Sequence, residues 1–367
     1  MVDPRLERLA AVLVGYGIQV EEGEWVQIRG DASSLPLLRQ IHKAVIRAGG
    51  YPTLIIDDSY AVRTLLREGS EAQLRWLDPI YDLFAERGDA IINILGTENT
   101  RANSNFDPQR NQIRQMARMG FNQTIMQRTA AADFKWMLAQ YPNHSGAQEA
   151  NMSLEEYRDF IYKACFCDRD DPITEWQRIS HMQQQKVDWL RNRRTVACRG
   201  PNIDLELSIA DRVFINAAGR QNMPDGEIFT GPVEDSANGW VRFTYPSIVD
   251  GSAVSGIELV FANGRVVEAS ADQNEELLHA QVNTDEGARY LGELGIGTNF
   301  GIQQFTGNML FDEKIGGTIH LALGLSYPET GGRNQSAIHW DMICDMRNSS
   351  EIYVDDELFY KNGEFVV

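Results

Sequence analysis

Two polar residues near the end of the chain have the types and the spacing of metal ligands. In the segment Ser336-Ala-Ile-His-Trp-Asp-Met-Ile343, His339 and Asp341 are separated by one residue. On a β-strand this spacing places both side chains on one face, with Trp340 and Met342 on the other. An imidazole and a carboxylate about 7 Å apart on one strand face can converge on a metal ion. The pattern therefore predicts that His339 and Asp341 face a common cavity.

A third candidate ligand precedes them by fewer than twenty residues. His320 lies in Gly317-Thr-Ile-His-Leu-Ala-Leu323, where the same alternation sends Leu321 and Leu323 to the opposite face. Two neighbouring strands would then supply three ligands. A histidine in such a place can also be hydrogen-bonded within a core or at the surface. Grouping with Asp341 favours metal binding, but periodicity alone leaves both interpretations open.

Other common catalytic signatures are absent from the sequence. Gly15-Tyr-Gly17 follows a helical pattern rather than a strand, and it lacks the third glycine of a dinucleotide-binding loop. No Walker loop, Gly-x-Ser-x-Gly elbow or His-Glu-x-x-His helix occurs. Cys165 and Cys167 have no second Cys or His pair nearby at zinc-site spacing, which favours ordinary buried thiols. Any chemistry must use another arrangement.

The composition limits the partners and the compartment. The 367 residues carry a formal net charge of -18, which disfavours binding to nucleic acid or to anionic membranes. No apolar stretch reaches membrane-spanning length, and the first nine residues lack the apolar core of a secretion signal. Four cysteines are too few for a disulfide framework in so long a chain. We expect a cytoplasmic protein.

The first half of the chain predicts an α/β domain over residues 1–192. Helical patterns at 4–18 and 34–48 alternate with strand-like segments at 25–30, 53–57 and 90–96. This alternation is typical of a mainly parallel sheet covered by helices. Residues 105–192 are expected to be mostly helical, including a capping-box start at Ser153.

The second half predicts a β-rich, barrel-like domain over residues 193–367, of α+β character. Short strand patterns follow one another from Thr195, and only one helix, at about 272–283, interrupts them. Asn263-Gly264 stands between two alternating segments, which is a strong hairpin signal. All the candidate ligands lie in this half.

Four motifs in this half resemble one known family, the metalloaminopeptidases typified by aminopeptidase T. The motifs are Pro224-Asp-Gly-Glu-Ile-Phe-Thr-Gly-Pro232, Gly292-Glu-Leu-Gly-Ile-Gly-Thr-Asn299, Gly317-Thr-Ile-His-Leu-Ala-Leu-Gly324 and Ser336-Ala-Ile-His-Trp-Asp-Met-Ile-Cys-Asp345. The resemblance is tight from about residue 200 to 350 and looser before that. It implies an aminopeptidase, a homodimer that encloses the catalytic cavity, and short peptides as substrates.

The resemblance also implies a set of site residues. The family's ligands for two divalent ions, zinc, cobalt or manganese, fall on Glu227, Glu293, His320, His339 and Asp341. Its active-site tyrosine falls on Tyr327. We expect Glu293 to bridge the ions and Tyr327 to hydrogen-bond the substrate carbonyl. Taken alone, the two glutamates would be ordinary surface carboxylates and the tyrosine a packing residue.

Glycines flank these positions, at 226, 292, 295, 297 and 324. They are consistent with turns and sheet bends, and also with close approach of the backbone to a ligand.

Two other functions remain open. A single-iron oxygenase that cleaves aromatic rings would need only two histidines and one carboxylate. The presence of Glu227 and Glu293 favours two ions instead. A non-catalytic binding protein, with the N-terminal half making the contacts, is the other alternative.

Overall fold

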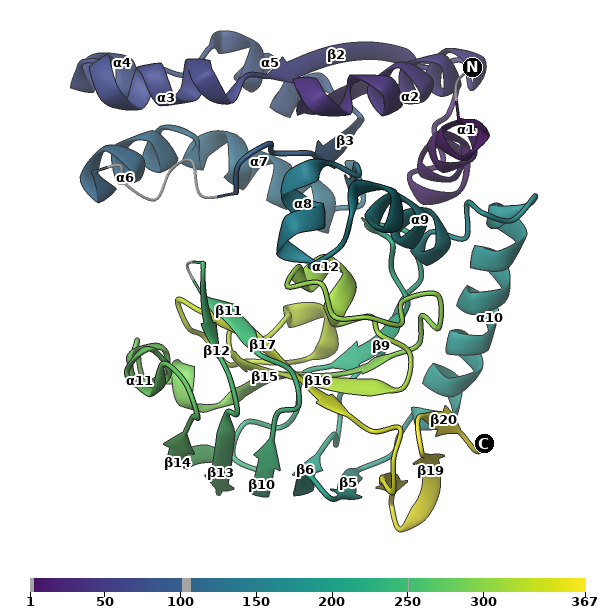
Figure 1. Cartoon of the computed structure of the whole chain (residues 1–367), viewed down its shortest axis with the longest axis vertical. Coiled ribbons are helices and arrows are strands. Elements are labelled where there is room, and N and C mark those ends of the chain that lie inside the picture. The colour runs from purple at the N-terminus through teal and green to yellow at the C-terminus, as the bar shows by residue number, and fades with distance from the viewer. Residues whose placement is uncertain (1–2, 101–106, 250) are drawn as a thin grey trace. The chain divides into compact units, whose positions relative to one another are not determined.

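The computed structural model describes residues 3–100, 107–249 and 251–367. Contacts divide it into two compact units (Figure 1). The N-terminal unit comprises Met1–Ile173 and Gly219–Pro224, and the C-terminal unit comprises Thr174–Ala218 and Asp225–Val367. Residues 105 and 106, where the expected helical stretch begins, lie outside the described part. No described helix has the length and apolar character to cross a membrane.

The N-terminal unit contains a parallel sheet, as its alternating sequence predicted. Its order is β2 (Tyr51–Asp57), β1 (Trp25–Asp31), β3 (Ala90–Leu95), β4 (Lys135–Gln140) and β8 (Asn222–Met223). Every neighbouring pair is parallel. Strand β4 lies within the stretch expected to be mostly helical. Its six residues are too short an apolar run to be distinguished from a buried helix by periodicity.

Several helices of this unit begin at recognisable caps. The side chain of Asp3 caps α1, and Ser153 forms the predicted capping box with Glu156 at α9. The helices are α1 (Pro4–Ala11), α2 (Leu35–Arg47), α3 (Ser59–Glu68), α4 (Glu71–Arg75), α5 (Pro79–Arg87), α6 (Pro108–Ala117), α7 (Met119–Ala130), α8 (His144–Glu149) and α9 (Leu154–Ala164), with a π-helical turn η1 (Val12–Gly17) and a 3-10 turn η2 (Ala32–Ser34).

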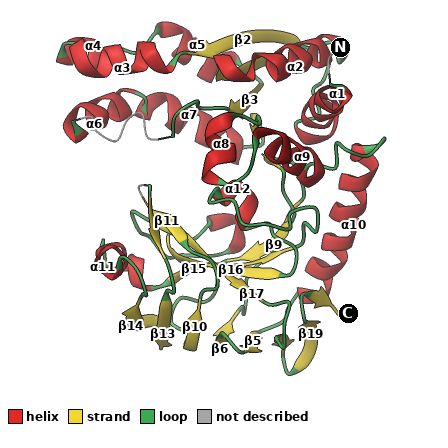
Figure 2. Cartoon of the chain, in the orientation of Figure 1, coloured by secondary structure: helices red, strands yellow, loops and turns green. Residues whose placement is uncertain are grey.

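The C-terminal unit is rich in antiparallel strands (Figure 2). One sheet has the order β14 (Arg265–Ser270), β13 (Glu258–Ala262), β10 (Asn238–Arg242), β6 (Ile203–Ser208), β5 (Thr195–Gly200), β18 (Glu351–Val354), β19 (Glu357–Lys361) and β20 (Glu364–Phe365). The predicted hairpin joins β13 to β14, with φ of 49° at Asn263 and 79° at Gly264.

A second sheet carries the candidate ligands. Its order is β17 (His339–Asp345), β16 (Thr318–Gly324), β15 (Leu291–Gly297), β9 (Glu227–Thr230) and β7 (Ile215–Ala217), and all its pairs are antiparallel. A small hairpin pairs β11 (Ser247–Val249) with β12 (Ser252–Val254). The remaining elements are α10 (Pro172–Leu190), α11 (Glu275–Val282), α12 (Met309–Asp312), η3 (Gly287–Arg289) and η4 (Pro328–Thr330). The fold class predicted from the sequence is therefore confirmed.

The hydrophobic core fixes which face of the second sheet is left for chemistry. Leu321 and Leu323 of β16, with Trp340 and Met342 of β17, are buried in the main core cluster of this unit. Residues alternate between the faces of a strand, so the intervening side chains must emerge on the other side. Burying the apolar face thus directs the polar residues of both strands to one surface.

Strand β15 needs an irregularity to join this arrangement. Leu291, Leu294 and Ile296 are all in the core, although a regular strand would send odd- and even-numbered residues to opposite faces. The register with β16 shifts between Leu291 and Glu293. This bulge at Gly292 inserts one residue and turns Glu293 to the face opposite the core.

A candidate metal centre on the second sheet

All five predicted ligands meet on the face of the second sheet that lies opposite the core. The Nε2 atom of His320 lies 3.1 Å from Oε2 of Glu227 and 3.1 Å from Oε1 of Glu293. The Nε2 atom of His339 lies 3.3 Å from Oε2 of Glu293 and 3.5 Å from Oδ2 of Asp341. Strands β9, β15, β16 and β17 lie in the middle of the C-terminal unit (Figure 1).

Glu293 divides these residues into two overlapping clusters. Ligand atoms of Glu227, Glu293 and His320 lie within 4.8 Å of one another, and so do those of Glu293, His339 and Asp341. The two oxygens of Glu293 face different histidines. A carboxylate in this orientation has one donor atom for each of two cations.

Small residues opposite the ligands make this close approach possible. In the sheet register, Gly295 pairs with His320, Gly297 with Glu227, and Gly324 with His339. A Cβ atom on Gly295 would overlap the imidazole of His320. Of the glycines noted in the sequence, Gly295 thus has a specific steric reason. The absence of a side chain at Gly295 leaves room for the His320 ring.

The ring of His339 is oriented by a backbone contact. Its Nδ1 lies 2.7 Å from the carbonyl oxygen of Leu325, which can only accept a hydrogen bond. In the neutral imidazole, Nε2 then keeps the lone pair and faces Glu293 and Asp341. A hydrogen bond of this kind to the second nitrogen is typical of metal-binding histidines. His320 lacks that support, since its buried Nδ1 has no hydrogen-bond partner in the described part of the chain.

Tyr327 lies at the edge of the site, next to His339. The centroids of the two rings are 4.9 Å apart, and Tyr327 also packs edge-on against Phe229, with 5.8 Å between centroids. Burial, together with the nearby Glu293 and Asp341 carboxylates, raises the pKa of the Tyr327 phenol above its ordinary value. The hydroxyl therefore stays protonated at neutral pH and is available as a donor.

The carboxylates and imidazoles of the site shift one another's pKa values. Burial opposes charge on Glu293, yet hydrogen bonds from His320 and His339 outweigh it and lower the pKa of Glu293 to about 2. Burial likewise opposes a proton on His339, but Glu293 and Asp341 raise its pKa to about 9. The pKa of His320 is also raised, by Glu227 and Glu293 against the effect of burial. Without metal, protons on the imidazoles thus balance the carboxylates.

These residues fit a pair of divalent ions. Burial raises the pKa of Asp341, and its Oδ1 atom is buried without a hydrogen-bond partner among the described residues. A buried polar atom left in this way is costly unless a ligand meets it. Carboxylate oxygens and imidazole nitrogens suit zinc, cobalt and manganese. Metal binding would replace the imidazole protons and satisfy the carboxylates.

Two further residues hold Glu227, and no sequence pattern indicated either of them. Lys314 Nζ lies 2.7 Å from Glu227 Oε1. Gln183, fully buried on α10, donates from Nε2 to the backbone carbonyl of Glu227 at 2.6 Å and accepts from the hydroxyl of Thr298 at 2.9 Å. Neither lies in a recognisable motif, because each reaches Glu227 only through the tertiary fold.

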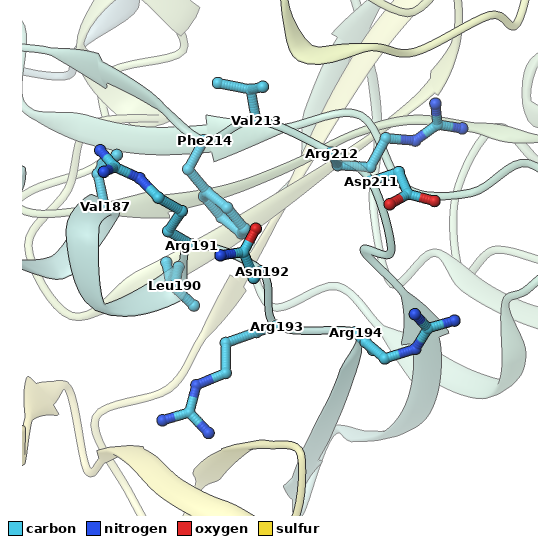
Figure 3. A pocket seen from close by; sticks show the side chains of 10 residues that line it. All are labelled: Val187, Leu190, Arg191, Asn192, Arg193, Arg194, Asp211, Arg212, Val213 and Phe214. Carbon is cyan, nitrogen blue, oxygen red and sulfur yellow. The ribbon is translucent and has the colours of Figure 1, made fainter.

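A pocket of about 520 Å³ in the same unit lies away from these ligands. Four arginines line it, and their side chains point in different directions (Figure 3). Three of the four are paired with carboxylates: Arg191 with Asp188 at 2.8 Å, Arg193 with Glu357 at 2.8 Å, and Arg212 with Glu234 at 2.7 Å. The pocket therefore offers no converging charge for chemistry.

Comparison with known proteins agrees with this geometry. The model of the family described as thermophilic metalloprotease (M29) matches residues 2–365. The chain belongs to the M29 family. Members of this family are metal-dependent peptidases, so this M29 protein is a hydrolase of peptide bonds. The family predicted from the four motifs is confirmed.

Relatives of this M29 protein match it over nearly its whole length. Aminopeptidase 2 of Geobacillus stearothermophilus is 28% identical over 96% of this chain and 94% of its own. Aminopeptidase T of Thermus thermophilus is 26% identical over 98% of this chain and 95% of its own. A solved structure of wild-type AmpT from Thermus thermophilus superposes with a TM-score of 0.86, at 24% identity and 99% coverage of both chains, which shows the same fold.

Replacing Gly295 with alanine tests the space occupied by His320. The added methyl group would overlap the imidazole. We expect Gly295→Ala to weaken binding of the ion near His320. The rate of peptide hydrolysis should fall about 100-fold, because a misplacement of about 1 Å at a reacting centre can cost about this much. Metal content by mass spectrometry and the rate of leucyl-anilide hydrolysis measure this.

Gly120→Ala is the matched control, because a Cβ at Gly120 would meet nothing within 4 Å. It should leave both quantities unchanged. Full metal content and rate in Gly295→Ala would show that His320 does not need this space.

Proposed function

We propose that this M29 protein removes the N-terminal residue of short peptides with the help of two divalent ions, zinc, cobalt or manganese. Its domain at residues 193–367 would be catalytic, with ligands Glu227, Glu293, His320, His339 and Asp341. The observation that carries the proposal is the position of Glu293, which presents one oxygen to each of two clusters.

The same geometry disfavours a single-iron oxygenase. Such a site needs two histidines and one carboxylate around one ion. Here His320 and His339 belong to different clusters, and each cluster contains two carboxylates. The relatives named as aminopeptidases count against a non-catalytic binding protein.

The chain's own residues would bind and orient the peptide. Two bound ions would lower the pKa of water toward neutrality and polarise the scissile carbonyl. Glu293 would fix the spacing of the two clusters, and the protonated Tyr327 would donate to the carbonyl oxygen. The free, uncharged α-amine of a peptide would bind one of the two ions directly, which would confine cleavage to the amino end. The relatives named as aminopeptidases support this preference.

The remaining parts of the proposal concern compartment and assembly. All four cysteines are buried, and so few in a chain of this length fit a cytoplasmic protein. We also propose a homodimer. Strand β2 is at the edge of the N-terminal sheet, and Tyr51, Leu54 and Ile56 on it are 67%, 37% and 42% exposed. An edge strand with exposed apolar residues is suited to pairing with a second copy.

Removing single ligands should distinguish the two clusters. Glu293 belongs to both, so Glu293→Gln should lose both ions and all hydrolysis. His339 belongs to one, so His339→Ala should keep one ion and lose most activity. Metal content after exchange with zinc, cobalt or manganese is measured beside hydrolysis of a panel of amino-acid anilides and short peptides.

The exposed His279 on α11 provides the control, because His279→Ala should retain two ions and full activity. Ring cleavage by the iron(II) protein under oxygen, without peptide hydrolysis, would support the oxygenase instead. A wild-type protein that neither retains metal nor cleaves any peptide would support a binding protein.

Blocking the substrate amine tests where cleavage occurs. We expect hydrolysis of leucyl anilide and none of N-acetyl-leucyl anilide, because acetylation leaves the substrate without a basic amine that could bind an ion. Chromatographic detection of the released aniline measures both. Equal rates on the two substrates would contradict an aminopeptidase.

The dimer is tested by light scattering of the purified protein. We expect a mass twice that of the 41.4 kDa chain, and a shift to the monomer in Ile56→Lys, which places a charge on the exposed edge strand. Glu68→Lys, on the neighbouring helix α3, is the control for added positive charge. A monomeric, fully active wild type would refute the dimer.

A further inference from the structure

A buried ammonium group contacts Glu227, a member of the cluster formed by Glu227, Glu293 and His320. Lys314 follows α12, and its side chain is only 1% exposed. Lysine is almost never fully buried unless it is paired. Its Nζ contacts Oε1 of Glu227 at 2.7 Å, pairs with Glu313, and lies 3.9 Å from Oδ1 of Asp225. The ammonium is therefore fixed by several carboxylates, of which only Glu227 belongs to a metal cluster.

The two oxygens of Glu227 have different surroundings as a result. Oε1 accepts a hydrogen bond from Lys314, whereas Oε2 faces Nε2 of His320 at 3.1 Å. The backbone of the same residue is held by Gln183, which donates to its carbonyl oxygen. With one oxygen and the main chain both anchored, the carboxylate has little freedom to rotate.

In the cluster of Glu293, His339 and Asp341, the hydroxyl of Ser247 donates to the backbone carbonyl of Asp341 at 3.0 Å, but no ammonium among the described residues holds its carboxylate. Asp341 faces His339 through Oδ2, while its Oδ1 is buried without a hydrogen-bond partner in the described chain. Asp341 therefore has both oxygens available for a cation, and Glu227 has one. The asymmetry between the clusters originates in a single lysine.

We infer that Lys314 is a positioning residue of the metal centre, which occupies one oxygen of Glu227 so that only the other can bind a cation. The inference rests on the proposed function, and it concerns the cluster of Glu227, Glu293 and His320 alone. Loss of a group that hydrogen-bonds a metal-binding carboxylate typically costs about 10–100-fold in metal affinity or activity. Lys314 does not touch the substrate in this account.

The test compares the cobalt-loaded wild type with Lys314→Met and Lys314→Arg. Methionine has nearly the same length without the ammonium, so Glu227 becomes free to bind through both oxygens. We expect two cobalt ions to be retained, because removing a buried positive charge does not weaken cation binding. The visible absorption of cobalt should weaken as its coordination number rises, and kcat should fall about 10–100-fold with KM within about threefold. Lys314→Arg keeps a cationic donor and should restore the wild-type spectrum.

An identical cobalt spectrum and kcat in Lys314→Met would overturn the inference. Loss of both ions with a lowered melting temperature would also overturn it, because that result indicates a purely structural role. If Lys314→Met does not fold, a crystal structure of the cobalt-loaded wild type decides the matter. It should show Glu227 bound through Oε2 alone with Lys314 still on Oε1, and coordination through both oxygens would refute the inference.

Failure of this inference can be separated from failure of the proposed function. A wild type that binds two ions and hydrolyses peptides, but shows Glu227 bound through both oxygens, contradicts only the role of Lys314. A wild type that binds no metal contradicts the proposed function itself.

Discussion

Three carboxylates gathered at one buried site must be balanced by positive charge, and this constraint governs the C-terminal unit. Glu227, Glu293 and Asp341 are each at most 9% exposed. Burying charges without partners is prohibitively expensive, so their environment has to provide cations. In the metal-free protein the two imidazoles and one lysine meet this need. Bound metal ions would replace the protons on the imidazoles, because the nitrogen atoms that carry these protons are also the atoms that can bind a metal.

Packing of the second sheet against the core brings the five candidate ligands to one face. Its other face is buried in the core of the unit, and strand alternation then delivers the polar side chains to one surface. Residues from four adjacent strands can meet only where neighbouring positions are small. Gly295 provides this space for His320, and the bulge at Gly292 corrects the direction of Glu293. The site is therefore built into a rigid scaffold.

Aromatic side chains border the site on the side of His339. Tyr327 and Phe229 form an aromatic edge beside His339. Relatives named as aminopeptidases match this chain over nearly its whole length.

Local pattern was enough to determine several features of this protein. The alternation in β16 and β17 assigned His320, His339 and Asp341 to the face away from the leucines, and alternating elements indicated the parallel sheet. Glu227 and Glu293 came only from motif resemblance, because an isolated glutamate carries no periodic signal. Strand β4 was missed because a short apolar run fits a buried helix equally well. The bulge at Gly292, the fit of His320 against Gly295, and the contacts of Lys314 and Gln183 with Glu227 were decided by the tertiary structure. Each depends on pairing between segments far apart in the chain, and no local pattern encodes such pairing.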